Sequence, residues 1–69
     1  MTLIPVDSTS VQQIGYDEPT QTLHVEFRNG SAYQYFDVPL HVFQEMTNAE
    51  SKGQYINQVI KGSYRFARL

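Results

Sequence analysis

The alternation of apolar and polar residues is most regular between Thr22 and Arg28. Leucine, valine and phenylalanine alternate there with histidine, glutamate and arginine. A period of two predicts a strand with one apolar face and one charged face. Val11–Tyr16 and Ala32–Phe36 predict two more strands, although Gly15 weakens the first of them. Residues 1–9 predict an irregular or loosely attached start.

The turn at Asn29–Gly30 predicts a hairpin between the second and third strands, and the hairpin can close in two registers. A two-residue loop makes Tyr33 oppose Glu26 and Tyr35 oppose His24. Both rings would then lie on the charged face as an exposed platform.

A three-residue loop over 28–30, with Gly30 in a left-handed bulge position, shifts the register by one residue. Tyr33 then opposes Val25 and Tyr35 opposes Leu23, and both rings join the core.

We favour the three-residue loop because the other register buries the amide of Gln34 among apolar side chains. An unsatisfied buried amide costs about 1–3 kcal/mol. The favoured register leaves Gln34 in solvent and exposes Phe36 more. The two-residue loop is the commoner geometry, so both registers stay open.

Two helices are predicted after the strands. Pro39 suits a first helical position and Asp37 can cap it, and the helix should run to about Asn48. Its expected buried stripe comprises Leu40, Phe43 and Met46 or Thr47. Residues 51–54 have the form of a capping box that opens a second helix. The expected stripe of that helix comprises Tyr55, Ile56, Val59 and Ile60.

Gly62 is expected to end the second helix in a left-handed conformation. The segment 63–69 is expected to be either a short edge strand or an extended tail. The predicted fold is therefore α+β: a three-stranded antiparallel meander followed by two short helices packed on one face, with a C-terminal edge strand as an option. A chain of 69 residues has room for one small core, so a single domain over 1–69 is expected.

The composition indicates a cellular compartment and shows that charge is unevenly distributed along the chain. The chain has no cysteine, which is typical of a reducing cytoplasm, and no apolar run approaches the roughly 18 residues of a membrane segment. Residues 1–50 hold all seven acids and one base, a net charge of −6, whereas residues 51–69 hold four bases and no acid. This asymmetry indicates either a solvated edge or an anion-binding face in the last third.

No catalytic or metal-binding pattern is present. The two histidines, His24 and His41, are expected to be exposed, and no cysteine completes a zinc set. No nucleotide-binding glycine motif occurs. We therefore expect a protein that is not an enzyme, has no catalytic residue and needs neither a metal nor a cofactor.

An ordered set of motifs runs along the chain. Its parts are Gly15-Tyr16-Asp17, Leu23-x-Val25-x-Phe27, Gly30, Tyr33-x-Tyr35, Val38-Pro39 and Ala49-x-Ser51-Lys52-Gly53-x-Tyr55-x-Asn57. Over about residues 11–66 the chain resembles the KTSC domain, which is named for the C-terminus of some lysyl-tRNA synthetases and also occurs as small bacterial proteins. Tyr33 and Tyr35 correspond to the central motif of that family.

The resemblance implies an RNA-binding role, for tRNA or single-stranded RNA, and implies no catalytic residue. The residues expected to contact RNA are Lys52, Lys61, Tyr64, Arg65 and Arg68, which combine phosphate-neutralising and base-stacking groups. The acidic pI of about 5.5 argues for modest affinity. Against this, Tyr55, Tyr64 and Phe66 are each expected to be core residues, because aromatic rings bury much apolar surface. The alternative function is a protein-interaction or small-ligand-binding module, with a protein partner or a second copy bound at the sheet face or edge.

Overall fold

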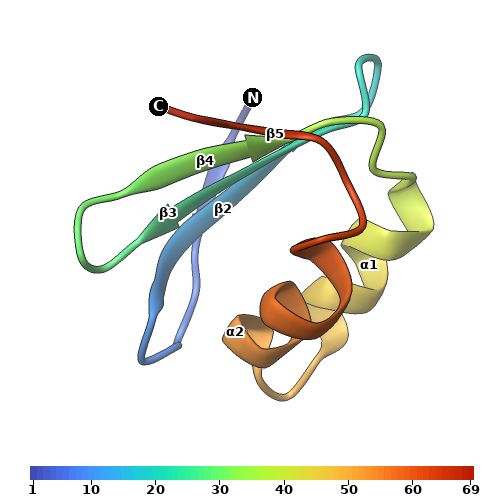
Figure 1. Cartoon of the computed structure of the whole chain (residues 1–69). Coiled ribbons are helices and arrows are strands. Elements are labelled where there is room, and N and C mark those ends of the chain that lie inside the picture. Colours follow the sequence, from blue (N-terminus) through green and yellow to red (C-terminus); the bar gives the residue numbers. More distant parts are fainter.

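The computed structural model describes all residues from 1 to 69 and contains one five-stranded antiparallel sheet. The strands lie in sequence order: β1 (Leu3–Pro5), β2 (Val11–Asp17), β3 (Thr22–Phe27), β4 (Ala32–Tyr35) and β5 (Phe66–Arg68) (Figure 1). The helical part comprises α1 (Leu40–Asn48), α2 (Lys52–Tyr55) and the π-helical turn η1 (Ile56–Ile60) that continues α2. The α+β class is confirmed. The sheet has five strands, whereas the prediction was three strands with a possible fourth at the edge.

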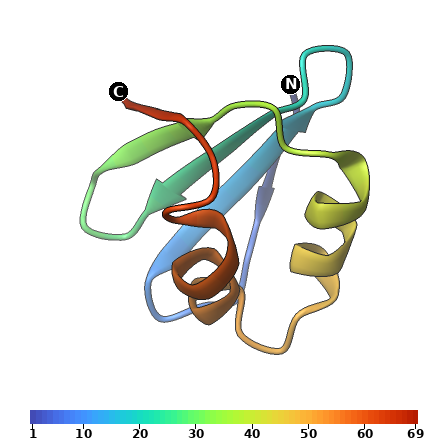
Figure 2. The ribbon, with the colours of Figure 1, turned by 45° about the vertical axis from the view of Figure 1, so that its right-hand side comes forward.

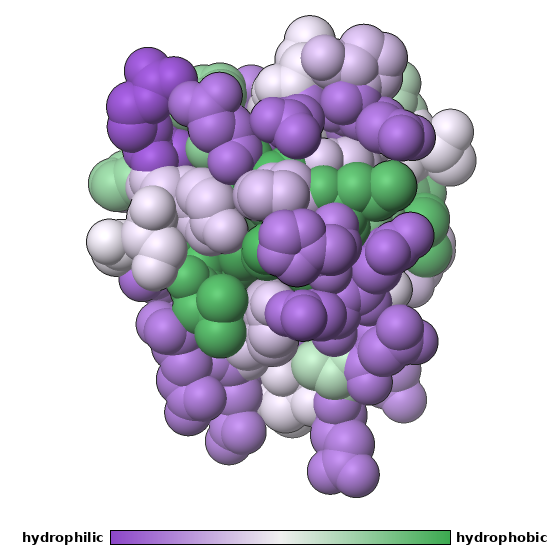
Figure 3. Space-filling view, turned by 90° about the vertical axis from the view of Figure 1, so that its right-hand side faces the viewer, coloured by the Kyte–Doolittle hydropathy of each residue, from purple (hydrophilic) through white to green (hydrophobic).

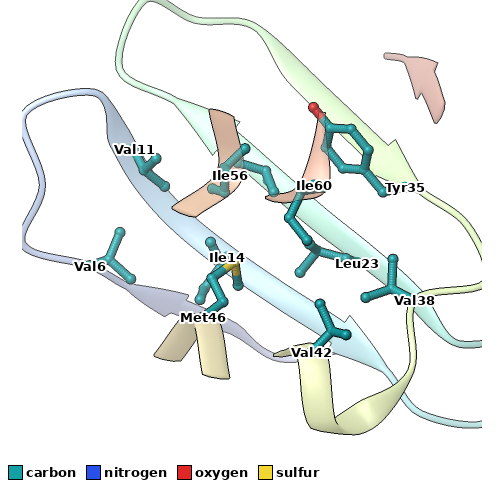
Figure 4. Packing of buried hydrophobic residues seen from close by; sticks show 11 residues of the cluster. Val6, Val11, Ile14, Leu23, Tyr35, Val38, Val42, Met46, Ile56 and Ile60 are labelled. Atoms are coloured by element: carbon teal, nitrogen blue, oxygen red, sulfur yellow. The ribbon is translucent and has the colours of Figure 1, made fainter. Parts of the chain in front are cut away.

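The helices pack on one face of the sheet, as the turned view shows (Figure 2). Side chains from both layers meet in a single core, drawn in Figure 4, which contains Val6, Val11, Ile14, Leu23, Val25, Tyr35, Val38, Val42, Met46, Ile56 and Ile60. Burial of these side chains provides the main stabilisation of a chain without disulfides.

The outer side of the helical layer is mostly polar. Figure 3 shows the side of the molecule that carries α1, where hydrophilic side chains surround separate apolar patches. No helix is both long enough and apolar enough to cross a membrane.

The hairpin between β3 and β4 closes in the register of the three-residue loop. Tyr35 lies opposite Leu23 and Tyr33 lies opposite Val25, which confirms the favoured register. Gly30 has a φ of 93°, the left-handed conformation that this loop requires. The Phe27 N–H donates to the Ser31 carbonyl at 2.8 Å and closes the loop.

The first residues form a strand, so the prediction of an irregular start was wrong. Leu3–Pro5 pairs with β2, and the Val6 side chain enters the core. This segment is too short to show a period of two in its sequence. Its strand conformation is stabilised by pairing with β2.

The start of α1 also differs from the prediction. Pro39 occupies the N-cap position, with a ψ of 152°, and the helix has no side-chain cap. Asp37 instead has a left-handed backbone (φ 59°), and its carboxylate accepts a hydrogen bond from Arg65 at 2.8 Å. Val42 and Met46 are the buried residues of α1, whereas Leu40 and Phe43 of the expected stripe are only partly buried. The Phe43 ring stacks on the Tyr16 ring, with 4.7 Å between centroids.

The second helix begins as predicted. The Gln54 N–H donates to the Ser51 hydroxyl, which caps α2. Ile56 and Ile60 are buried, but Val59 is exposed, because only one narrow stripe of so short a helix faces the sheet. Gly62 has the predicted left-handed φ of 85°. The segment after it forms the edge strand β5. Of the two expectations for residues 63–69, the short edge strand is therefore confirmed and the extended tail is not.

Candidate nucleic-acid interface

The pairing of β4 with β5 brings the C-terminal segment against the central tyrosines. Phe66 lies beside Tyr35, and Arg68 lies beside Tyr33. Because side chains of directly paired residues project from the same face of a sheet, all four point to the side that carries the helices. Residues more than 30 positions apart in the sequence therefore share one surface.

Four rings on this side form what we call the aromatic cluster, which consists of Phe27, Tyr33, Tyr35 and Phe66. The Tyr33 centroid lies 5.8 Å from that of Phe27, 6.4 Å from that of Tyr35 and 6.0 Å from that of Phe66. These separations are typical of favourable ring pairs. The cluster runs from the core to the surface, because Tyr35 is 2% exposed and Phe66 is 59% exposed.

Two cations flank the aromatic cluster. The Lys61 Nζ atom lies 5.4 Å from the centroid of the Phe27 ring, and the Arg68 Cζ atom lies 5.8 Å from that of Tyr33. Each such contact contributes about 0.5–1 kcal/mol at an exposed site. Exposed aromatic surface and positive charge are therefore combined on one face.

The other residues expected at the site lie elsewhere. Arg65 stands over the Phe36 ring and pairs with Asp37, and strand alternation places it on the face of the sheet away from the helices. The Lys52 Nζ atom donates to the Ala49 carbonyl at the start of α2. Tyr64 is partly buried against the core. The structure thus brings Lys61 and Arg68 together with aromatic rings and does not bring all four bases to one patch.

The face of the sheet away from the helices carries a polar network. Gln13 donates to Glu26 Oε1 at 2.7 Å, and His24 Nε2 lies 2.9 Å from Glu26 Oε2. Gln34 Nε2 lies 3.5 Å from His24 Nδ1, at the limit of a hydrogen bond. His24 is only 9% exposed, so the prediction of an exposed histidine was wrong, because neighbouring strands cover its ring.

Hydrogen bonds and burial shift the ionisation of several groups. The hydrogen bonds from Gln13 and His24 hold the pKa of Glu26 below its ordinary value. Burial raises the pKa of Tyr35. Burial, followed by the hydrogen bond that its hydroxyl donates to Glu45, raises the pKa of Tyr55. No group of three or more histidine, cysteine, aspartate or glutamate side chains is arranged to hold a metal ion, and no pocket is present.

Sequence reasoning missed the part that Phe27 and Phe66 play in this surface. Phe66 was an expected core residue and is instead the most exposed ring of the cluster. The alternation of Tyr64 and Phe66 with polar residues indicated a strand, but it did not show which strand would be its neighbour. Pairing with β4 fixes the side to which Phe66 points.

The known proteins that resemble this chain are either much longer than it or of about the same length. The chain is 43% identical over 67 residues to a lysine–tRNA ligase of Nostoc punctiforme, and it spans only 12% of that protein's length. It is 40% identical to an uncharacterized protein of Stutzerimonas stutzeri and covers 99% of it. The crystal structure of a KTSC domain protein from Yersinia pestis matches with a TM-score of 0.93 and 36% identity, over 99% of this chain and 96% of that one.

The same family emerges from the sequence and the fold. The family model of the KTSC domain matches residues 7–64, which include the hairpin, both helices and Tyr64. Since the match covers most of the chain and the solved KTSC domain protein from Yersinia pestis shares its fold, this chain belongs to the KTSC domain family.

Proposed function

We propose that this chain is an RNA-binding domain that holds unpaired RNA on the aromatic cluster between Lys61 and Arg68. The observation that supports the proposal is the position of each cation over an aromatic ring, beside the exposed ring of Phe66. Proteins that bind single-stranded nucleic acid combine aromatic stacking with positive charge in this way.

Phe66 supplies the stacking surface in this proposal. Its ring is 59% exposed and rests on Tyr33 and Tyr35, with 6.0 Å between centroids in each case. A ring held by two others is pre-organised, so a base that stacks on it pays little additional ordering entropy. Stacking of one base contributes about 1–3 kcal/mol.

Lys61 and Arg68 would neutralise the phosphates on either side of a stacked base. Arg65 lies next to the Asp37 carboxylate, which repels phosphate, and Lys52 lies at the far end of the second helix. In this proposal, Lys52, Tyr64 and Arg65 therefore contribute less to RNA binding than Lys61 and Arg68 do. Two principal phosphate contacts predict weak binding with a salt slope of about −1.4 in log K against log [salt].

The relatives add support from a second direction. The lysine–tRNA ligases that match this chain act, by their name, on tRNA, and a region of each corresponds to nearly the whole chain. A small RNA-binding domain suits an enzyme with an RNA substrate. For this chain, tRNA and unpaired RNA are accordingly the first ligands to test.

The test compares two double variants that remove the same charge. Binding of fluorescent uridine-rich and adenine-rich single-stranded RNA, and of bulk tRNA, is measured by anisotropy at low salt. Lys61→Ala with Arg68→Ala is expected to weaken binding at least tenfold, whereas Lys52→Ala with Arg65→Ala is expected to weaken it by less than threefold.

The matched pair separates a defined site from general electrostatic attraction. Equal losses in both double variants would mean that net charge, not the aromatic cluster, attracts RNA. Absence of binding by the unaltered chain at low salt would reject the proposal. Circular dichroism of each variant checks that the fold is retained.

A further inference from the structure

The backbone of β5 has one side free. The Leu69 N–H donates to the Ala32 carbonyl and the Phe36 N–H donates to the Arg65 carbonyl, both at 2.9 Å. In an antiparallel pair, residues whose backbone groups face the neighbour alternate with residues whose groups face away. The N–H and C=O groups of Phe66 and Arg68 therefore point outward, and β5 is the last strand in the order of the sheet.

The opposite edge of the sheet is protected. The Val6 N–H donates to the Gln12 carbonyl, so the outward residues of β1 are Leu3 and Pro5. Pro5 has no N–H, and a proline at an outward position stops a further strand from pairing. Only one of the two edges thus offers a complete set of donors and acceptors.

The charge around β5 selects what can pair there. Residues 51–69 contain no acid, and Arg68 lies on the strand itself. A second copy paired through its own β5 would place the Arg68 side chains of both copies along one short junction, where like charges repel. An acidic strand would instead meet opposite charges.

We propose that the outer edge of β5 accepts an extended acidic segment of a partner protein as a sixth strand. The outward groups of Phe66 and Arg68 repeat at the two-residue spacing of a β-ladder, which a peptide backbone matches. Acidic side chains at alternate positions of the added strand would lie beside Arg68. The hydrogen bonds supply the affinity, and the arginine supplies the preference for acidic sequences.

This site shares the Arg68 side chain with the proposed RNA site but relies otherwise on different groups. Strand addition uses backbone groups in the plane of the sheet, whereas RNA would stack on rings that project from its face. Removing the outward N–H of Arg68 is expected to abolish strand addition and to leave RNA binding within a factor of about two. Failure of one proposal therefore does not imply failure of the other.

The test uses a blocked peptide of alternating glutamate and valine, six residues long, titrated into the isotopically labelled chain and followed by amide NMR. The expected result is saturable binding, with the largest shifts at the Phe66 and Arg68 amides and with slower hydrogen exchange there. A lysine–valine peptide of the same length is expected to bind at least tenfold more weakly. A synthetic chain with N-methylated Arg68 keeps every side chain and is expected to lose binding.

Four outcomes would overturn the proposal. They are no binding at millimolar peptide, equal binding of both peptides, shifts centred on β1 or the helices, and unchanged binding by the N-methylated chain. Protection of the same amides on raising the protein concentration alone would identify a second copy as the occupant. Protection of these amides by single-stranded RNA, with no effect of the acidic peptide, would assign the edge to RNA.

Discussion

The Arg68 guanidinium lies over the ring of Tyr33, with 5.8 Å between Cζ and the ring centroid. The two residues are also direct partners across β4 and β5. One strand pairing thus joins the first tyrosine of the family motif to a cation of the last strand. The second tyrosine, Tyr35, lies two pairs further along, opposite Phe66, and is buried. The two tyrosines therefore have different tasks: Tyr35 belongs to the core, and Tyr33 links the core to the surface.

Replacing Tyr35 with alanine is expected to destabilise the fold severely. The ring is 2% exposed and is part of the core, and removal of a large buried ring costs about 3–5 kcal/mol. A domain of this size has a total stability on the order of 3–10 kcal/mol. Urea unfolding of Tyr35→Ala should therefore show either a largely unfolded chain without denaturant or a midpoint at a much lower urea concentration than that of the unaltered chain.

Tyr35→Phe is the matched control, because it keeps the ring and is expected to change the free energy of unfolding by less than about 1 kcal/mol. Tyr33→Ala is expected to cost less than Tyr35→Ala, since its ring is only partly buried. Equal losses for the two alanine variants would contradict the division of tasks.

The central sheet was predictable because several local signals agree. The alternation over β3, the glycine at position 30 and the cost of burying Gln34 all favour the register that the structure has. The cap at Ser51 and the left-handed Gly62 were predictable for the same reason, since each depends on a few adjacent residues.

Features that depend on distant partners were not predictable. The strand β1 exists because β2 pairs with it, and Phe66 is exposed because β5 lies at an edge that the helices do not cover. His24 is buried because residues of neighbouring strands surround it. For the candidate site, the charge split indicated the last third of the chain, but only the pairing of β4 with β5 shows that Arg68 lies on the side of the aromatic rings and Arg65 on the other face.

Replacing Phe66 with alanine is expected to weaken RNA binding and to leave the fold intact. Loss of one stacking surface corresponds to about 1–3 kcal/mol, or roughly a 5- to 150-fold rise in Kd. The ring is mostly exposed, so the free energy of unfolding should fall by less than about 1 kcal/mol.

The measurement for Phe66 is RNA anisotropy together with urea unfolding of the same preparation. Phe66→Tyr keeps an aromatic face and should retain binding. Val59→Ala, which also removes exposed apolar surface but lies on η1, should have no effect. Unchanged affinity in Phe66→Ala would exclude this ring as the stacking surface.

Replacing Gly15 with alanine is expected to loosen β1. A Cβ atom at this position would lie 2.8 Å from Leu3 Cδ2 and 2.8 Å from Met1 Sδ, closer than carbon and sulfur atoms can approach. Both neighbours are ends of flexible side chains and can move aside, so the cost should be about 1 kcal/mol. Hydrogen exchange of the Val6 amide, which bonds to β2, should become faster, whereas that of Phe27 should not change. Slower or unchanged exchange at Val6 would contradict this account.

Stability should fall in acid through Glu26. Hydrogen bonds from Gln13 and His24 stabilise its carboxylate in the folded chain, so the folded pKa lies below the ordinary value of 4.5 that applies to the unfolded chain. A group whose pKa is lowered by folding contributes its full stabilisation above the unfolded pKa and loses it as the pH falls through the folded pKa. The contribution is therefore present at neutral pH and declines below about pH 4.5.

Urea unfolding between neutral pH and about pH 3 measures this decline. Glu26→Gln removes the carboxylate, so the variant should be less stable than the unaltered chain at neutral pH, and the difference should shrink as the pH falls below 4.5. Glu50→Gln, at an exposed position with no hydrogen-bonded partner, is the control and should leave both the stability and its pH dependence nearly unchanged. A pH-independent difference between Glu26→Gln and the unaltered chain would contradict this account, because the stabilisation would then not depend on the ionisation of Glu26. No difference at any pH would show that the carboxylate adds nothing to stability that the isosteric amide lacks.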